Sequence, residues 1–219
     1  MLLSLLLSLS STSSAPILGP LGRPASAWFL RLVTSQNPAL GAELHNEAGV
    51  KPFTVSTLLD GRGRTLQIGR WLQPGEECWL RITTLREDVS SLLLQTCNKG
   101  RLPGHLEFYK MGFRLQGWTL DPAQHPWAGQ SSFPDLAQQY RRDRHSRRVR
   151  LEFTSPTAFR NGQADVPLPQ PGSVFRSYYE KWNALAPEDL HFQALWPEFA
   201  ARCITVNEVS GLNTERWVF

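Results

Sequence analysis

The chain has 219 residues, of which 41% are hydrophobic and 19% charged; this composition fits one large or two small folded domains and excludes a disordered chain. Its net charge of +4 and its pI of about 9.2 make the surface mildly basic, which favours a nucleic-acid partner without identifying one. The three cysteines, Cys78, Cys97 and Cys203, form no CxxC or Cys/His cluster, which excludes a disulfide framework and a zinc site of that kind.

The first 14 residues, MLLSLLLSLSSTSS, allow two interpretations. Their apolar character and the Ala15-Pro16 that follows resemble a secretory signal peptide. The first basic residue is Arg23, however, so the positively charged region of a signal peptide is missing. The run of leucines with interspersed serines is also typical of an inner strand. We expect a first strand, with a cleaved signal peptide as the alternative.

Helix and strand signals follow in turn. Asn37 is typical of a helix cap and Pro38 of a first helical position, so a short helix is expected to end at His45. The expected elements are the connection Pro16–Pro24, the helices Ala25–Val33 and Asn37–His45, the strand Pro52–Leu59, the turn Asp60–Gly63, the strand Glu77–Leu85, the helix Glu87–Cys97, and a strand or hairpin within Leu106–Leu120, interrupted by Gly112 and Gly117. This order predicts a ferredoxin-like βαββαβ domain over residues 1–122.

The second half of the chain suggests a repeat of the same pattern. Residues 123–146 are expected to be a linker with a short basic helix that starts near Ser132. From residue 147 a second ferredoxin-like domain is expected, which makes the fold class α+β with two tandem domains. Its expected elements are a strand with Val149, Leu151 and Phe153 on one face, a helix over Val174–Leu185, and a strand pair at Cys203–Val209 and Asn213–Phe219.

The connection between the short helix and the second strand holds the candidate catalytic residues. His45 closes the helix, and Lys51 follows six positions later, just before the strand. A histidine exchanges protons near neutral pH and a lysine carries a positive charge, so the pair could cleave a phosphodiester without a metal. A histidine at a helix end is also commonly a dipole partner, and a lysine before proline is commonly only solvated.

The amino-acid sequence of this segment resembles that of a known family. LHNEAGVKPFTVSTLL is similar to the signature of the CRISPR-associated endoribonucleases that process repeat RNA, which belong to the RAMP superfamily. In that family a helix ending in LH leads to a KPFTVS strand, and the histidine is the usual catalytic residue. FTSPTAFR, at positions 153–160, resembles the segment that opens the second ferredoxin-like domain of the same family.

The resemblance implies an endoribonuclease that acts on CRISPR repeat RNA without a metal or cofactor. The 2′-hydroxyl of the RNA would attack the adjacent phosphorus, with His45 as general base or general acid and Lys51 stabilising the phosphate charge. Some relatives carry a catalytic tyrosine in the first helix, which this chain lacks; Arg31 is its weakly supported replacement. The implied partners are repeat RNA or crRNA, and subunits of a CRISPR effector complex or a second copy of the chain are compatible with it.

An arginine-rich run offers contacts for RNA phosphates. YRRDRHSRRVR, at positions 140–150, carries six arginines, each able to add a salt-dependent phosphate contact. The candidate RNA-binding residues are Arg141, Arg142, Arg144, Arg147 and Arg148. A solvated helix end followed by a strand flank explains the same run equally well.

Three further expectations accompany this interpretation. The reduced cysteines predict a cytoplasmic protein, and no further apolar run is long enough for a membrane span. The family normally ends with a glycine-rich loop and a final strand, which this sequence lacks, so the second domain is expected to be incomplete at its C-terminus. Two rival functions share these residues: a non-catalytic crRNA-binding RAMP subunit, and a secreted α+β binding protein.

Overall fold

The computed structural model describes residues 1–142, 148–153, 157, 159–161, 164–166 and 168–211. The chain divides into two compact units, Met1–Leu136 (unit 1) and Ala137–Phe219 (unit 2). The sequence placed the end of the first domain at residue 122. Unit 1 extends further because a short strand within the expected linker, β8 (Gly129–Ser131), pairs with the first strand of the sheet.

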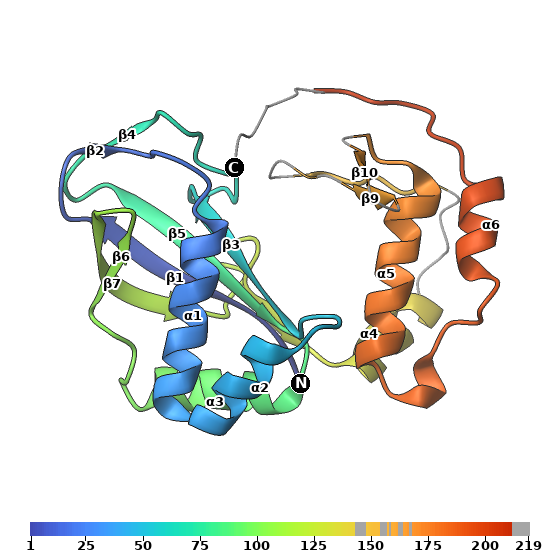
Figure 1. The fold of residues 1–219 in the computed structure, drawn as a ribbon, viewed down its shortest axis with the longest axis horizontal. Coiled ribbons are helices and arrows are strands. Elements are labelled where there is room, and N and C mark those ends of the chain that lie inside the picture. Colours follow the sequence, from blue (N-terminus) through green and yellow to red (C-terminus); the bar gives the residue numbers. More distant parts are fainter. Residues whose placement is uncertain (143–147, 154–156, 158, 162–163, 167, 212–219) are drawn as a thin grey trace. The chain divides into compact units, whose positions relative to one another are not determined.

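A six-stranded antiparallel sheet forms the centre of unit 1 (Figure 1). Its strands run in the spatial order β3-β5-β1-β7-β6, with β8 paired to β1 beside this path. β1 is the central strand, because β5 and β7 pair with its two edges. The first residues of the chain are thereby confirmed as a strand. The bounds are β1 Leu2–Ser11, β3 Phe53–Leu59, β5 Glu77–Thr84, β6 His105–Phe108 and β7 Met111–Thr119.

The helices of unit 1 cover the sheet through their apolar faces. α1 (Gly22–Gln36), α2 (Pro38–Asn46) and α3 (Glu87–Asn98) contribute to one hydrophobic core together with alternate leucines of β1. In α1 the buried positions follow helical spacing: Ala25, Trp28, Phe29, Leu32 and Val33. A separate two-stranded ribbon joins β2 (Ala15–Pro16) to β4 (Trp71–Leu72). The order β1, α1–α2, β3, β5, α3, β7 is the strand and helix order predicted for this half.

The start of α2 follows the local sequence signals. The side chain of Asn37 accepts a hydrogen bond from Leu40 N at 3.1 Å, and Pro38 occupies the first helical turn. Gly41 lies against α1, where a Cβ added to it would be 2.7 Å from Thr34 Cα. The two helices therefore approach too closely for any side chain at position 41.

We expect Gly41→Ala to reduce the free energy of unfolding by about 1–3 kcal/mol, because the new methyl group meets backbone that must shift. Gly22→Ala is the matched control, since a Cβ at that helical position has nothing within 4 Å. Its effect should stay within about 0.5 kcal/mol. Chemical denaturation of the three proteins measures both changes. Equal stability of the two variants would show that α1 and α2 do not pack as described.

The β6–β7 hairpin turns at residues that the sequence did not single out. Tyr109 and Lys110 have φ values of 47° and 67°, in the left-handed region usually occupied by glycine. Gly112, which was expected to interrupt this segment, lies within β7 and pairs with Glu107. Two successive left-handed residues suit the twist of a tight hairpin, so pairing of the two strands determines this turn rather than glycine.

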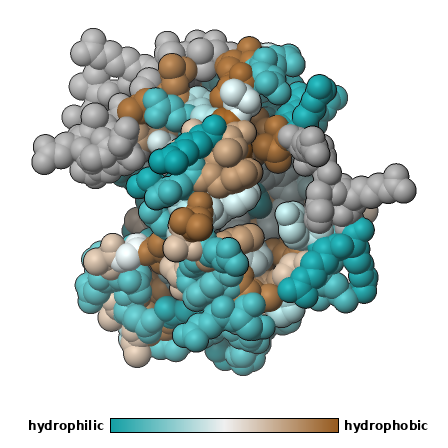
Figure 2. Space-filling view, turned by 90° about the vertical axis from the view of Figure 1, so that its right-hand side faces the viewer, coloured by the Kyte–Doolittle hydropathy of each residue, from teal (hydrophilic) through white to brown (hydrophobic). Residues whose placement is uncertain are grey.

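Unit 2 is described in part and consists mainly of helices. α5 packs against α6 through aromatic rings, with Phe175 and Trp196 at a centroid distance of 6.4 Å. Some large side chains of this unit are exposed, including Tyr178 and Phe199, and hydrophobic and hydrophilic residues are interspersed on the face shown in Figure 2. The helix α4 Phe133–Arg142 begins in unit 1 and ends in unit 2. The other bounds are β9 Phe159–Asn161, β10 Ala164–Val166, α5 Pro171–Leu185, a 3-10 turn at Glu188–Leu190 and α6 Trp196–Cys203.

Two predicted strands of unit 2 are wrong. Residues 148–153 form no strand, and the side chains of Val149, Leu151 and Phe153 are exposed. The segment Cys203–Val209 is not a strand either, because Cys203 ends α6 and residues 204–211 adopt no regular structure. In both places apolar residues alternate without burying a face, and burial is what makes alternation a strand signal. The second expected strand of the pair, Asn213–Phe219, lies outside the described residues.

Candidate active site

The two candidate catalytic residues lie on either side of the turn that leaves α2. His45 occupies the last turn of α2, where its side chain is exposed. The Nζ atom of Lys51 donates hydrogen bonds to Leu44 O at 2.7 Å and to His45 O at 3.3 Å. The ammonium group therefore binds the free carbonyls at the negative end of the helix. The structure brings the Lys51 ammonium to the backbone of His45.

Both ends of this connection are anchored in unit 1. Leu44, next to His45, is completely buried, and the ring of Phe53 packs on Phe29 at a centroid distance of 5.0 Å. Leu85 N donates to Pro52 O at 2.7 Å, which fixes the start of β3 to the end of β5. The exposed imidazole at the end of α2 and the ammonium just before β3 thus lie at the two ends of a short loop between fixed elements, and this arrangement favours a defined position for both groups.

An ionic cluster ties α2 to the start of α3. The Arg86 guanidinium contacts Glu43 Oε1 at 2.7 Å and forms a bidentate pair with Asp88 at 2.7 and 2.8 Å. Hydrogen bonding to Asp88 raises the pKa of Arg86, and the same bond lowers the pKa of the Asp88 carboxyl. Glu43 lies two residues before His45, so this cluster holds the helix turn that carries the candidate catalytic residue. No pattern in the sequence singles out Arg86.

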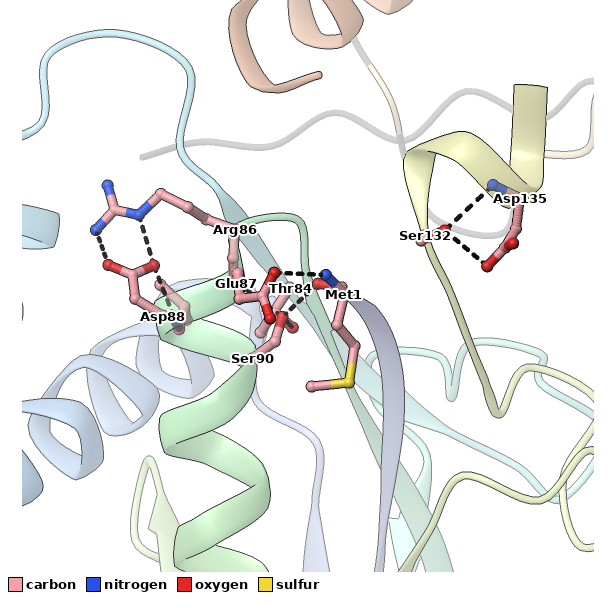
Figure 3. A network of polar contacts seen from close by, with 9 residues as sticks. Met1, Thr84, Arg86, Glu87, Asp88, Ser90, Ser132 and Asp135 are labelled. Atoms are coloured by element: carbon pink, nitrogen blue, oxygen red, sulfur yellow. Dashed lines mark hydrogen bonds and ion pairs between the residues drawn. The ribbon is translucent and has the colours of Figure 1, made fainter. Parts of the chain in front are cut away.

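Figure 3 shows how the same region joins the start of β1 to α3. The Ser90 hydroxyl donates to Met1 O at 3.0 Å and lies 2.7 Å from Thr84 Oγ1. The N-terminal ammonium contacts Glu87 Oε2 at 3.3 Å. Together with the Arg86 pairs, these contacts fix the start of α3 next to the start of β1 and the end of β5. The ion pair of Arg86 with Glu43 connects this region to α2, which carries His45.

Arg31, the third catalytic candidate, lies elsewhere on unit 1. Its exposed side chain lines a hollow of about 320 Å³ together with Arg101 and Pro103. Neither His45 nor Lys51 lines this hollow, and within unit 1 Arg31 makes no recorded hydrogen bond or ion pair with either residue. The structure brings His45 and Lys51 together and does not bring Arg31 to them.

Three of the five candidate RNA-binding arginines fall within the described residues. Arg141 and Arg142 are exposed in the last turn of α4, and Arg148 is exposed beyond it. Arg144 and Arg147 lie outside the described residues. All five belong to unit 2, whereas His45 and Lys51 belong to unit 1.

The environment of His125 is structural. It is completely buried, and burial lowers the pKa of the ring. Its Nδ1 atom accepts a hydrogen bond from Trp127 N at 3.1 Å, while Nε2 lies 3.4 Å from Asp60 O. The ring also packs on Trp79 at a centroid distance of 5.1 Å. A neutral imidazole thus fastens the segment before β8 to the sheet.

The remaining titratable groups suggest no second centre in the described part of the chain. Burial raises the pKa of the Cys78 and Cys97 thiols to about 12, which keeps both protonated and unreactive. Across the described ranges, no three histidine, cysteine or acidic side chains are grouped to hold a metal ion. No helix of those ranges is both long and apolar enough to cross a membrane.

Comparisons with known proteins assign the chain to a family. The family model for the CRISPR Cas6 N-terminal domain matches residues 1–138, and the model for the CRISPR-associated endoribonuclease Cas6 matches residues 151–214. No curated protein matches the chain. Solved structures do match it, and they share its fold.

Three of these structures illustrate the likeness. The Cas6 (TTHB231) product complex is 26% identical with a TM-score of 0.66, covering 92% of this chain and 72% of that one. The Cas6 (TTHA0078) product complex is 22% identical with a TM-score of 0.55, covering 85% and 64%. Thermus thermophilus Cas6 (TTHB231) is 26% identical with a TM-score of 0.52, covering 85% and 62%. The chain thus spans about two thirds of the length of these relatives. Since its α+β fold and both family models agree, the chain belongs to the Cas6 family of CRISPR-associated endoribonucleases in the RAMP superfamily, with an N-terminal and a C-terminal Cas6 domain.

Proposed function

We propose that this chain is a metal-independent endoribonuclease that binds and cleaves CRISPR repeat RNA. The observation that carries the proposal is the exposed imidazole of His45 at the end of α2, with the Lys51 ammonium bound to the backbone of the same turn. Membership of the Cas6 family supports the choice of RNA as substrate.

The reaction needs one proton acceptor, one proton donor and a positive charge. The 2′-oxygen loses its proton and bonds to the adjacent phosphorus, while the bond from phosphorus to the 5′-oxygen breaks and that oxygen gains a proton. His45 serves one of the two proton transfers. Lys51 stabilises the negative charge that develops on the phosphate oxygens. An ammonium group has three donors, and the two carbonyls use two of them, so one stays available for the phosphate.

The same proposal includes a second ferredoxin-like domain and an RNA-binding arginine run. The Cas6 model over residues 151–214 supports the domain assignment, with β9, β10, α5 and α6 as its described elements. Arg141, Arg142, Arg144, Arg147 and Arg148 would contact RNA phosphates. The exposure of Arg141 and Arg142 is compatible with this role. Arg31 stays a weaker catalytic candidate, because it makes no recorded contact with the other two.

Cleavage of a CRISPR repeat RNA in the presence of EDTA tests the proposal. We expect the same cleavage rate with EDTA as with Mg²⁺. In the proposed mechanism His45 transfers a proton and Lys51 stabilises the phosphate charge, so no metal ion is needed. Gel analysis of end-labelled RNA measures the rate. Cleavage that requires Mg²⁺ would contradict the mechanism. Tight RNA binding without cleavage in either buffer would favour the non-catalytic crRNA-binding subunit instead.

A further inference from the structure

A second basic feature of unit 1 is absent from the proposed mechanism. It is the hollow of about 320 Å³ that contains Arg31, and we refer to it as the basic hollow. One wall is a face of α1, and the other is the segment that follows α3. Its lining residues are Trp28, Arg31, Leu32, Ser35, Arg101 and Pro103.

The charge of the basic hollow is uncompensated. Other arginines of unit 1 hold carboxylates: Arg64 binds Asp60 at 2.9 Å and Arg70 binds Glu76 at 2.6 Å. Within the described residues neither the Arg31 nor the Arg101 guanidinium makes a hydrogen bond or ion pair, and no acidic side chain lines the hollow. Two guanidinium groups facing one hollow repel each other unless an anion lies between them, so the site suits an anionic ligand.

The shape of the hollow indicates which anion fits. Trp28 and Leu32 are each 7% exposed and make a closed apolar floor. The Ser35 hydroxyl donates to Leu32 O at 2.7 Å, so it is already used within the helix. The two exposed guanidiniums are the charged groups of the lining that remain available to a ligand. Planar guanidiniums match the paired oxygens of a phosphate group, and a shallow site accepts a phosphate within a chain better than it encloses a small molecule.

A second hollow in unit 1 provides the contrast. It measures about 370 Å³, lies between α2 and α3, and includes Glu43 and Asp88 in its lining. Arg86 binds both of these carboxylates, so the acids in that hollow are compensated and no cation is left for a ligand. Of these two hollows in the described part of unit 1, the basic hollow is the one that favours phosphate.

We propose that Arg31 and Arg101 together bind a backbone phosphate of the RNA at a position separate from the cleaved bond. The choice of RNA as the ligand depends on the proposed function. The site itself depends on the two unpaired guanidiniums and not on that function. Arg31 then has a binding role in place of a catalytic one, and the RNA footprint on unit 1 extends from the end of α2 to the segment after α3.

Salt-dependent binding tests this proposal. The probe is a CRISPR repeat RNA with a 2′-deoxy sugar at the cleavage position, and its affinity is measured by fluorescence anisotropy at several salt concentrations. Each phosphate contact contributes about 0.7–0.9 to the slope of log affinity against log salt. We expect Arg31→Gln and Arg101→Gln each to lower the slope by about that amount, and Arg101→Lys to keep the wild-type slope because the charge remains.

Arg62→Gln is the matched control. Arg62 is exposed in the turn after β3, and no side-chain partner of its guanidinium is recorded in unit 1. Its replacement removes the same charge away from the basic hollow and should leave the slope within experimental error. Equal slopes for wild type, Arg31→Gln and Arg101→Gln would overturn the proposal, as would an equal loss in Arg62→Gln. Thermal melting confirms that the variants are folded.

A comparison of cleavage and binding separates the two proposals. With cleavable RNA, the losses in Arg31→Gln and Arg101→Gln should appear in the RNA concentration needed for half-maximal rate rather than in the rate at saturation. A fall in the saturating rate of Arg31→Gln alone, with an unchanged slope, would make Arg31 catalytic and overturn the binding role. If the two variants lower the slope of log affinity against log salt but no protein cleaves the RNA, the basic hollow is supported as a phosphate site and the nuclease function is contradicted. If wild type does not bind the RNA, both proposals fall.

Discussion

Repeat RNA with a single 2′-deoxy sugar at the cleavage position is expected to bind this chain and to remain uncut. The proposed nucleophile is the 2′-oxygen of the substrate, so removing that oxygen removes the reaction, whereas binding depends on phosphates and bases that are unchanged. The measurement pairs end-labelled cleavage over many hours with an affinity measurement on the same RNA. We expect no detectable product and an affinity close to that of the unmodified RNA.

The control for this experiment is the same RNA with the 2′-deoxy sugar one nucleotide away from the cleavage position. It makes the same chemical change but keeps the attacking hydroxyl, so it should be cut at nearly the normal rate. Cleavage of the first RNA at the original bond would show that water or another external nucleophile attacks. That result would contradict the proposed attack by the 2′-hydroxyl, and His45 would then have no assigned step.

His45→Ala should reduce the cleavage rate by about 10²–10⁴-fold, the usual contribution of a general acid or base. The side chain is exposed and the adjacent Leu44 supplies the buried contact, so the substitution opens no cavity and should leave stability unchanged. RNA affinity should stay near the wild-type value, because the imidazole carries a proton rather than a binding contact. Single-turnover cleavage and anisotropy measure the two properties.

His105→Ala is the matched control, since His105 is another exposed histidine of unit 1, on β6. It should cleave at the wild-type rate. Added imidazole should restore part of the activity of His45→Ala by replacing the missing proton carrier, and it should not affect His105→Ala. If His45→Ala cleaves normally, the residue is a helix-end histidine with no chemical role, and the catalytic assignment of the α2 turn is wrong.

The fold of unit 1 could largely be predicted because its signals are local. The cap at Asn37, the proline after it and the alternating run after Lys51 each determine an element within about ten residues, and each element is present. β8 could not be predicted, since three residues with no periodicity become a strand only when β1 provides an edge. The turn at Tyr109 is similar, because strand pairing overrides the preference of that residue for ordinary backbone conformations.

The residues of the candidate site differ in how far apart they lie along the chain. His45 and Lys51 are close along the chain, so a six-residue spacing was enough to place them together. The pair of Arg86 with Glu43 joins segments 43 positions apart, and Arg31 and Arg101, which line the same hollow, are still further apart along the chain. Such contacts depend on how α1, α2 and α3 pack, which no local pattern contains. The strand predicted from the alternating residues near Val149 is absent, because the apolar side chains of that segment are exposed rather than buried against another element.

The central place of β1 in its sheet affects how the protein must be made. A nascent chain leaves the ribosome with β1 complete at Ser11, but its partner β5 begins only at Glu77 and β7 at Met111. Until these partners are synthesised, both edges of the leucine-rich β1 segment are unpaired. Unpaired, apolar strand edges promote aggregation. Unit 1 is therefore expected to fold late and slowly, and to depend on chaperones during synthesis more than a helical protein of its size.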